Sequence, residues 1–188
     1  MNEILDHFRK TGALLEGHFI LRSGLHSREF FQCALLLQYT KIAERICGML
    51  AEKLHAFECE TIVSPALGGI IVGQEVARHL GKRHIFVEKN DQGGLVLRRG
   101  FTMQAGEKIV IAEDVITRGG RIRQTIDVIR ALGGMVMGAG CIVDRSSGLT
   151  PEFGCPFVSL IQMNVENFEA DKLPPDLAML PVMKPGSK

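Results

Sequence analysis

Short apolar runs alternate with helical patterns through the middle of this 188-residue chain. The runs are nearly continuous in apolar side chains, which is typical of strands buried on both faces of a sheet. The segments between them repeat apolar residues at helical spacing. This alternation predicts an α/β fold, with a parallel sheet flanked by helices on both faces. The expected strands are 61–64, 84–89, 108–112, 135–144 and 157–161.

The same pattern indicates where a ligand site should lie. In open parallel sheets, ligands bind outside the carboxyl ends of the strands. The loops that follow residues 64, 89, 112 and 144 are therefore the expected places for binding and catalytic side chains.

Smaller elements are expected around this sheet. An amphipathic helix over 2–11 opens the chain, and a hairpin or strand–loop–strand spans 17–31. Thr40 is expected to cap the next helix. A hairpin is expected over 91–100, and the Pro-rich tail over 173–188 is expected to be poorly ordered.

Composition excludes several classes of protein. The formal net charge is +1, so the chain offers no electrostatic case for binding nucleic acid or a membrane surface. Five cysteines form no CxxC pair, which argues against a zinc site or a disulfide scaffold and for a reducing compartment. The N-terminus does not resemble a signal peptide, and no apolar run approaches the roughly 20 residues of a membrane span. A cytoplasmic protein is expected.

The segment KIVIAEDVITRGGRIRQT (108–125) carries the most specific chemical signal. An apolar strand runs into two adjacent carboxylates, Glu113 and Asp114, and then into a loop with Thr117 and two glycines before a helix. Backbone amides of a glycine-rich turn at a helix N-terminus bind phosphate, and carboxylates accept hydrogen bonds from ribose hydroxyls. The segment therefore predicts joint recognition of a phosphate and a ribose.

The competing interpretation is a plain strand–turn–helix with solvated acids. That interpretation suits an isolated Gly-Gly turn better than it suits the whole string. The chain has no GxGxxG after a strand and no GxxxxGK[ST], so the signatures of dinucleotide sites and of P-loop NTPases are absent.

The string resembles the phosphoribosyl pyrophosphate (PRPP) motif of the type I phosphoribosyltransferases, in which an apolar strand precedes two acids and a Thr/Gly-rich loop. The N-terminal segment 17–31 is similar to the hood of the orotate phosphoribosyltransferases. It carries the matching residues Phe19, Leu21, Arg22, Ser23, Gly24, Ser27, Phe30 and Phe31. In addition, CIVDRSSG (141–148) resembles the strand end that carries the family's orotate-binding arginine, and SPALGG (64–69) matches its pyrophosphate loop.

The resemblance implies a single phosphoribosyltransferase domain over 1–188, with an N-terminal hood (1–38), an α/β core (39–165) and a C-terminal tail (166–188). It implies transfer of ribose 5-phosphate from PRPP to orotate, with Mg²⁺ held mainly by the substrate rather than by protein ligands, in a homodimer. The implied catalytic residues are Asp114, Glu113 and Lys89. The implied PRPP site comprises Glu113, Asp114, Val115, Ile116, Thr117, Arg118, Gly119, Gly120, Arg121 and Lys89. The implied orotate site comprises Thr117, Arg145, Arg22, Phe30 and Phe31.

Elementary chemistry supports an anionic base as the acceptor of the ribose 5-phosphate. Orotate carries a carboxylate, and the arginine fork is the side chain best suited to bind one. Purine-specific relatives usually stack the base on an aromatic residue near Arg145, and none occurs between Thr102 and Thr150. A solvated surface charge is the competing interpretation of either arginine taken alone.

The chain departs from the family pattern around the pyrophosphate. The stretch EKNDQGGLVLRRG (88–100) is shorter than the usual mobile loop and has Lys89 as its one lysine. Leu67-Gly68 stands where many members have an aromatic–Lys pair, and Gly120 stands near a usual hydroxyl. Arg98 and Arg99 either compensate for the missing lysines or decorate a hairpin. These departures keep two alternatives open, a phosphoribosyltransferase for another base and a non-catalytic PRPP-sensing regulator.

Overall fold

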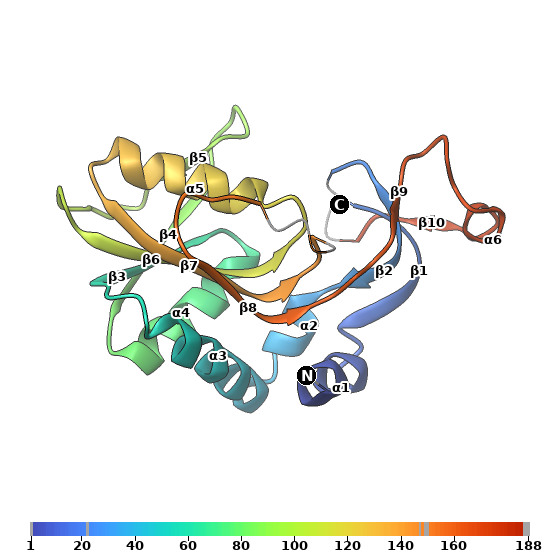
Figure 1. The fold of residues 1–188 in the computed structure, drawn as a ribbon, viewed down its shortest axis with the longest axis horizontal. Coiled ribbons are helices and arrows are strands. Elements are labelled where there is room, and N and C mark those ends of the chain that lie inside the picture. The colour runs from blue at the N-terminus through green and yellow to red at the C-terminus, as the bar shows by residue number, and fades with distance from the viewer. Residues whose placement is uncertain (1, 22, 147, 149–150, 186–188) are drawn as a thin grey trace.

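A computed structural model describes residues 2–21, 23–146, 148 and 151–185 of the chain. Two sheets lie side by side, a larger core sheet and a smaller hood sheet (Figure 1). Within the described residues, no helix is both long enough and apolar enough to cross a membrane.

The core sheet has six strands in the order β5-β4-β3-β6-β7-β8. Neighbouring strands are parallel, except that β5 pairs antiparallel with β4. This arrangement confirms the predicted parallel sheet and the hairpin expected over 91–100. The strands are β3 (Thr61–Pro65), β4 (Arg83–Lys89), β5 (Leu95–Leu97), β6 (Lys108–Ile116), β7 (Met135–Asp144) and β8 (Phe157–Gln162).

Helices cover both faces of the core sheet, as predicted. Helix α5 lies on one face, whereas α3 and α4 lie on the other (Figure 1). Each face has its own hydrophobic cluster, so the central strands are buried on both sides. The helices are α1 (Asn2–Lys10), α2 (Cys33–Leu37), α3 (Thr40–Leu54), α4 (Gly68–Leu80), α5 (Gly120–Ala131) and α6 (Pro175–Ala178).

The hood sheet combines the two ends of the chain. Its strand order is β10-β1-β2-β9, and the antiparallel β1–β2 pair is the hairpin expected over 17–31. The register of that hairpin shifts between Glu16 and Phe19, which marks a β-bulge. The strands are β1 (Leu14–Ile20), β2 (His26–Phe31), β9 (Asn167–Phe168) and β10 (Val182–Met183).

Two local expectations are wrong. Tyr39, not Thr40, occupies the N-cap of α3, and no side-chain hydrogen bond caps that helix. The tail is not poorly ordered over 173–185, because α6 and β10 lie there and β10 pairs with β1. Burial of Leu177 on α6, which is 0% exposed, gives this segment an apolar anchor.

All five cysteines are free, and four of them are buried. The four buried ones, Cys33, Cys47, Cys59 and Cys141, lie in the hydrophobic cores, as small core residues would.

Candidate active site

The two adjacent acids lie at the carboxyl end of β6, in the middle of the core sheet. The Glu113 side chain is buried, at 5% exposed. The backbone N–H of Asp114 donates to Glu113 Oε1 at 3.0 Å, and the N–H of Val115 donates to Asp114 Oδ1 at 2.7 Å. Each carboxylate is thus held in place by a backbone N–H of the adjacent residue.

The start of α4 lies directly against these acids. A Cβ built on Gly68 would collide with the Asp114 carboxylate, and one on Gly69 would lie 3.0 Å from Glu113 Oε1. The segment 64–69 and the acid pair, predicted separately from the sequence, therefore meet at one place. Glycine is required there because the helix N-terminus approaches the carboxylates so closely.

Burial raises the pKa of Asp114 above its ordinary value. Hydrogen bonds with Glu113 and with backbone amides act in the opposite direction and offset part of that increase. A hydrogen bond from a hydroxyl group stabilises a carboxylate that has little water around it more than it stabilises an exposed carboxylate.

The predicted phosphate loop joins β6 to α5. Gly119 occupies the N-cap of α5 with φ of 67°, and a Cβ there would lie 2.7 Å from ring carbons of Phe153. Gly120 is exposed, and a Cβ on it would meet nothing within 4 Å. Gly119 is therefore demanded by the fold, whereas Gly120 leaves open space in front of the helix N-terminus, where an anion is stabilised.

The remaining loop side chains differ in exposure. Thr117 and Arg121 are half-buried and Arg118 is exposed. Arg121 Nη1 donates to Gln124 Oε1 at 3.0 Å, within the first turns of α5.

Arg145 directly follows β7 and forms hydrogen bonds between the core and the hood. The residue is 3% exposed, and its Nη2 donates to Ser27 Oγ at 2.9 Å and to the Glu29 carbonyl oxygen at 3.1 Å. Its guanidinium carbon lies 5.5 Å from the centroid of the Phe31 ring. Burial lowers the pKa of Arg145 to about 10, so the side chain stays charged at neutral pH.

The two hood phenylalanines do not lie together. Phe31 packs edge-on against Phe8 at 5.2 Å and lies under Arg145, in the core cluster. Phe30 instead lies beside Phe19, with ring centroids 5.7 Å apart. Arg22, the remaining predicted orotate residue, lies outside the described residues.

The arginines after β4 serve the hairpin. Arg99 Nη2 lies 2.8 Å from Glu88 Oε2, and its guanidinium stacks on Phe86. Arg98 is exposed, as is Lys89 at the end of β4. Arg99 is therefore occupied by hairpin contacts, and Lys89 and Arg98 are the cations of this stretch for which the described residues show no ion pair.

The sequence placed Ser27 in the hood match and Ser64 in the pyrophosphate-loop match, but it did not indicate the contacts that Ser27, Ser64 or His84 make. Ser27 is 0% exposed and accepts from Arg145, while Ser64 Oγ lies 2.6 Å from His84 Nε2 beneath α4. Strand alternation was a usable signal for the first, because it places Ser27 and Phe31 on one face of β2.

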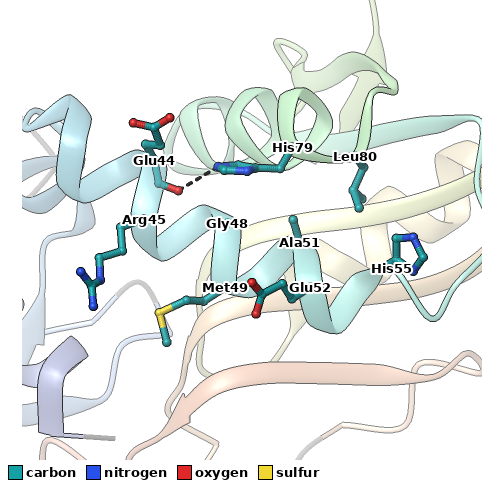
Figure 2. Close-up of a pocket in the computed structure, with 9 residues that line it drawn as sticks. All are labelled: Glu44, Arg45, Gly48, Met49, Ala51, Glu52, His55, His79 and Leu80. Atoms are coloured by element: carbon teal, nitrogen blue, oxygen red, sulfur yellow. Dashed lines mark hydrogen bonds between the residues drawn. The ribbon is translucent and has the colours of Figure 1, made fainter.

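Two clefts lie away from these residues. One of about 560 Å³ lies between α3 and α4, where the His79 ring lies across Gly48 and hydrogen-bonds the Glu44 carbonyl oxygen at 2.9 Å (Figure 2). The other, of about 410 Å³, is lined by residues that include Glu60, Arg83 and Glu107. None of the predicted site residues that the structure describes lines either cleft.

Known proteins resemble this chain over nearly its whole length. A family model described as a phosphoribosyl transferase domain matches residues 36–172. The orotate phosphoribosyltransferase of Desulforamulus reducens is 45% identical over 186 residues, which cover 99% of this chain and 96% of that protein. The orotate phosphoribosyltransferase of Caulobacter vibrioides is 46% identical over 189 residues, which cover 100% and 96%.

Solved structures show the same fold. The orotate phosphoribosyltransferase from Aeropyrum pernix superposes with a TM-score of 0.69 at 26% identity, over 85% of this chain and 93% of that one. An adenine phosphoribosyltransferase from Thermoanaerobacter pseudethanolicus shares the fold, with a TM-score of 0.63 at 22% identity, over 72% and 88%. The identity of about 45% extends over nearly the full length of both chains, including the hood and the acid pair described above. The chain therefore belongs to the phosphoribosyltransferase family, as one of its orotate phosphoribosyltransferases.

Proposed function

We propose that the site between β3, β6, β7 and the hood carries out the orotate phosphoribosyltransferase reaction of this chain. Orotate and PRPP give orotidine 5′-monophosphate and pyrophosphate, a step of pyrimidine biosynthesis. The observation that carries this placement is the meeting of the acid pair with the N-terminus of α4. The acid pair, which would bind ribose hydroxyls, and a helix N-terminus, which can bind a phosphate, thereby lie together at the carboxyl edge of the core sheet.

Glu113 and Asp114 would hold the ribose hydroxyls, and residues 117–121 would hold the 5′-phosphate. Fixed carboxylates and the open N-terminus of α5 support these roles. The reaction passes through a centre with oxocarbenium character, so positioning and electrostatics supply most of the catalysis. The deprotonated ring nitrogen of orotate is itself the nucleophile, and no side chain needs to form a covalent intermediate.

Arg145 and Thr117 would orient orotate, with Phe31 beneath the guanidinium. The buried charge of Arg145 supports recognition of a carboxylate, because an unscreened guanidinium binds one strongly. Arg22 and Phe30 remain in the proposed orotate site on the resemblance alone.

Lys89 would stabilise the departing pyrophosphate. Its exposed position at the end of β4 supports this role, because the side chain is free to reach a ligand beyond the sheet edge.

Mg²⁺ fits the oxygen donors of this site. Glu113 and Asp114 offer carboxylates, and no group of three or more His, Cys, Asp and Glu suited to a metal occurs in the described part of the chain. Mg²⁺ usually keeps few protein ligands at phosphate sites, so substrate oxygens would supply most of its ligands, and any protein carboxylate would come from this acid pair. When bound, the ion would neutralise charge on pyrophosphate.

The wider assignments rest on composition and on resemblance. A single domain with a hood over 1–38, a core over 39–165 and a tail over 166–188 is proposed, and the pairing of β9 and β10 with β1 and β2 supports joining the tail to the hood. Free cysteines support a reducing, cytoplasmic location. A homodimer is proposed from the family resemblance, and light scattering on the purified protein tests it.

Calorimetry with competing bases tests the site assignment. PRPP with Mg²⁺ should bind the wild type, and Asp114→Asn should weaken that binding. In a turnover assay, the rate of orotate consumption should not fall when adenine, hypoxanthine or uracil is added in equal amount. Turnover of a purine in preference to orotate would establish another base, and PRPP binding without any turnover would establish the sensing regulator.

A further inference from the structure

The contacts of Arg145 with the hood are confined to one strand. Its Nη2 donates to Ser27 Oγ at 2.9 Å and to the Glu29 carbonyl oxygen at 3.1 Å, and its guanidinium lies over Phe31. All three partners belong to β2. The position of this strand therefore determines the direction in which the guanidinium points.

The Nε–H group of Arg145 is a buried donor that is not used within the described residues. A buried donor without a partner costs roughly 1–3 kcal/mol, so such a group is retained where a ligand can satisfy it. The two hydrogens of Nη2 are taken up by β2, which leaves the Nε edge for an acceptor from outside the chain.

Ser27 is itself held in place from both sides. It pairs with Phe19 of β1 and with Asn167 of β9, and it is 0% exposed. A hydroxyl in the middle of a sheet has little freedom to move, so it fixes its donor more tightly than a loop residue would.

We propose that Ser27 is a positioning residue for orotate recognition. Its hydroxyl holds Nη2 of Arg145 so that Nε faces the orotate carboxylate or a ring carbonyl. This inference rests on the proposed role of Arg145 in binding orotate. It makes Ser27, which does not itself need to touch the base, a determinant of affinity for orotate but not for PRPP.

Steady-state kinetics of four variants test this role. Ser27→Ala removes the hydroxyl and should raise KM for orotate about tenfold, the size expected for losing one hydrogen bond to a charged group, with KM for PRPP unchanged. Thr61→Val is the matched control, because Thr61 is 1% exposed and its hydroxyl bonds Glu107 at 2.6 Å at the far end of β3. That control should leave both KM values unchanged.

Arg145→Lys and the double variant separate this inference from the function on which it rests. Arg145→Lys removes the fork and should raise KM for orotate, and adding Ser27→Ala to it should cause little further change, because both act through one contact.

Each outcome has one meaning. If Ser27→Ala lowers only the melting temperature and leaves KM for orotate unchanged, while Arg145→Lys raises it, Ser27 is merely structural and the inference is overturned. Fully additive effects in the double variant would overturn it as well. If Arg145→Lys leaves KM for orotate unchanged, the proposed orotate role of Arg145 itself is wrong.

Discussion

At the scale of single residues, Asp114 combines a proposed role in the reaction with a position that is costly for a charge. Burial raises its pKa, which means that the charged carboxylate is less stable in the folded protein than in water. A group whose folded pKa exceeds its unfolded pKa contributes stability at low pH and loses it as the pH rises through the folded value. Asp114 therefore destabilises the fold at neutral pH.

Asp114→Asn should separate stability from activity. We expect turnover to be nearly abolished, because the amide cannot replace a carboxylate acceptor for the ribose hydroxyls. The free energy of unfolding at pH 7 should be equal to or higher than that of the wild type, since Asn Oδ1 can still accept from the Val115 amide. Urea unfolding and an orotate assay measure the two quantities, and near-normal rates would remove the role given to this acid.

His84 provides a pH effect of the opposite sign. Burial lowers its pKa from 6.5 to about 4, and its Nε2 lies 2.6 Å from Ser64 Oγ. Between these two pH values the unfolded state binds a proton that the folded state does not, so stability falls as the pH is lowered through this window.

His84→Gln should flatten that dependence, because the amide can keep a hydrogen bond with Ser64 and does not titrate. The free energy of unfolding from urea titrations at pH 7.0, 6.0 and 5.0 should fall more steeply for the wild type than for the variant. Parallel curves would show that folding does not lower the pKa of His84.

At the scale of elements, α4 is seated unusually close to the sheet. Besides Gly68 and Gly69, Gly73 faces the strands, where an added Cβ would collide with His84 Nε2 and lie 2.6 Å from Ser64 Oγ. Close seating of this helix brings its N-terminus to the acid pair.

Gly73→Ala should push α4 away from the sheet. We expect a loss of roughly 1–3 kcal/mol in the free energy of unfolding, the usual cost of overpacking. Gly120→Ala is the matched control for stability, because its Cβ meets nothing within 4 Å. Equal stability of the two variants would contradict the close seating.

The major elements could be predicted from sequence because their signals are local. Strands buried on both faces, such as β6, show continuous apolar runs, and α5 shows helical spacing. The short elements α2, β9, α6 and β10 could not be predicted, since two to five residues carry too little pattern and tertiary contacts determine their structure. Tyr39 at the N-cap of α3 has no capping side chain, so no capping signal marked that boundary.

The candidate site divides in the same way. The acid pair and the phosphate loop are contiguous in sequence, so their chemistry could be predicted from a single segment. Phe30 and Phe31 are consecutive residues of β2, so their side chains point to opposite faces of that strand. The bond between Arg145 and Ser27, in contrast, joins residues 118 positions apart. Non-local contacts of this kind require the folded chain.

At the scale of the whole molecule, the C-terminal segment completes the hood begun at the N-terminus. Leu177 is 0% exposed, Asp176 pairs with Arg28, and His18 Nδ1 donates to the Leu180 carbonyl oxygen at 3.2 Å. Because β2 also contacts Arg145, both ends of the chain contribute to the hood that borders the proposed orotate site (Figure 1).

Leu177→Ala should destabilise this assembly by about 2–5 kcal/mol, the cost of removing a fully buried leucine. Met179→Ala, at a neighbouring position that is 81% exposed, should leave the free energy of unfolding nearly unchanged. Urea unfolding of both variants measures the difference. Similar values would mean that α6 does not contribute to the folded core of the hood.

The decisive measurement is the loss of orotate absorbance in the near ultraviolet with the purified protein, PRPP and Mg²⁺, while pyrophosphate is quantified in parallel. We expect orotate to disappear only when both PRPP and Mg²⁺ are present, with one pyrophosphate released per orotate consumed, and we expect Asp114→Asn to stop both. Orotate loss that persists in Asp114→Asn, or no loss from a wild-type protein that still binds PRPP, would contradict the assignment of the reaction to this site.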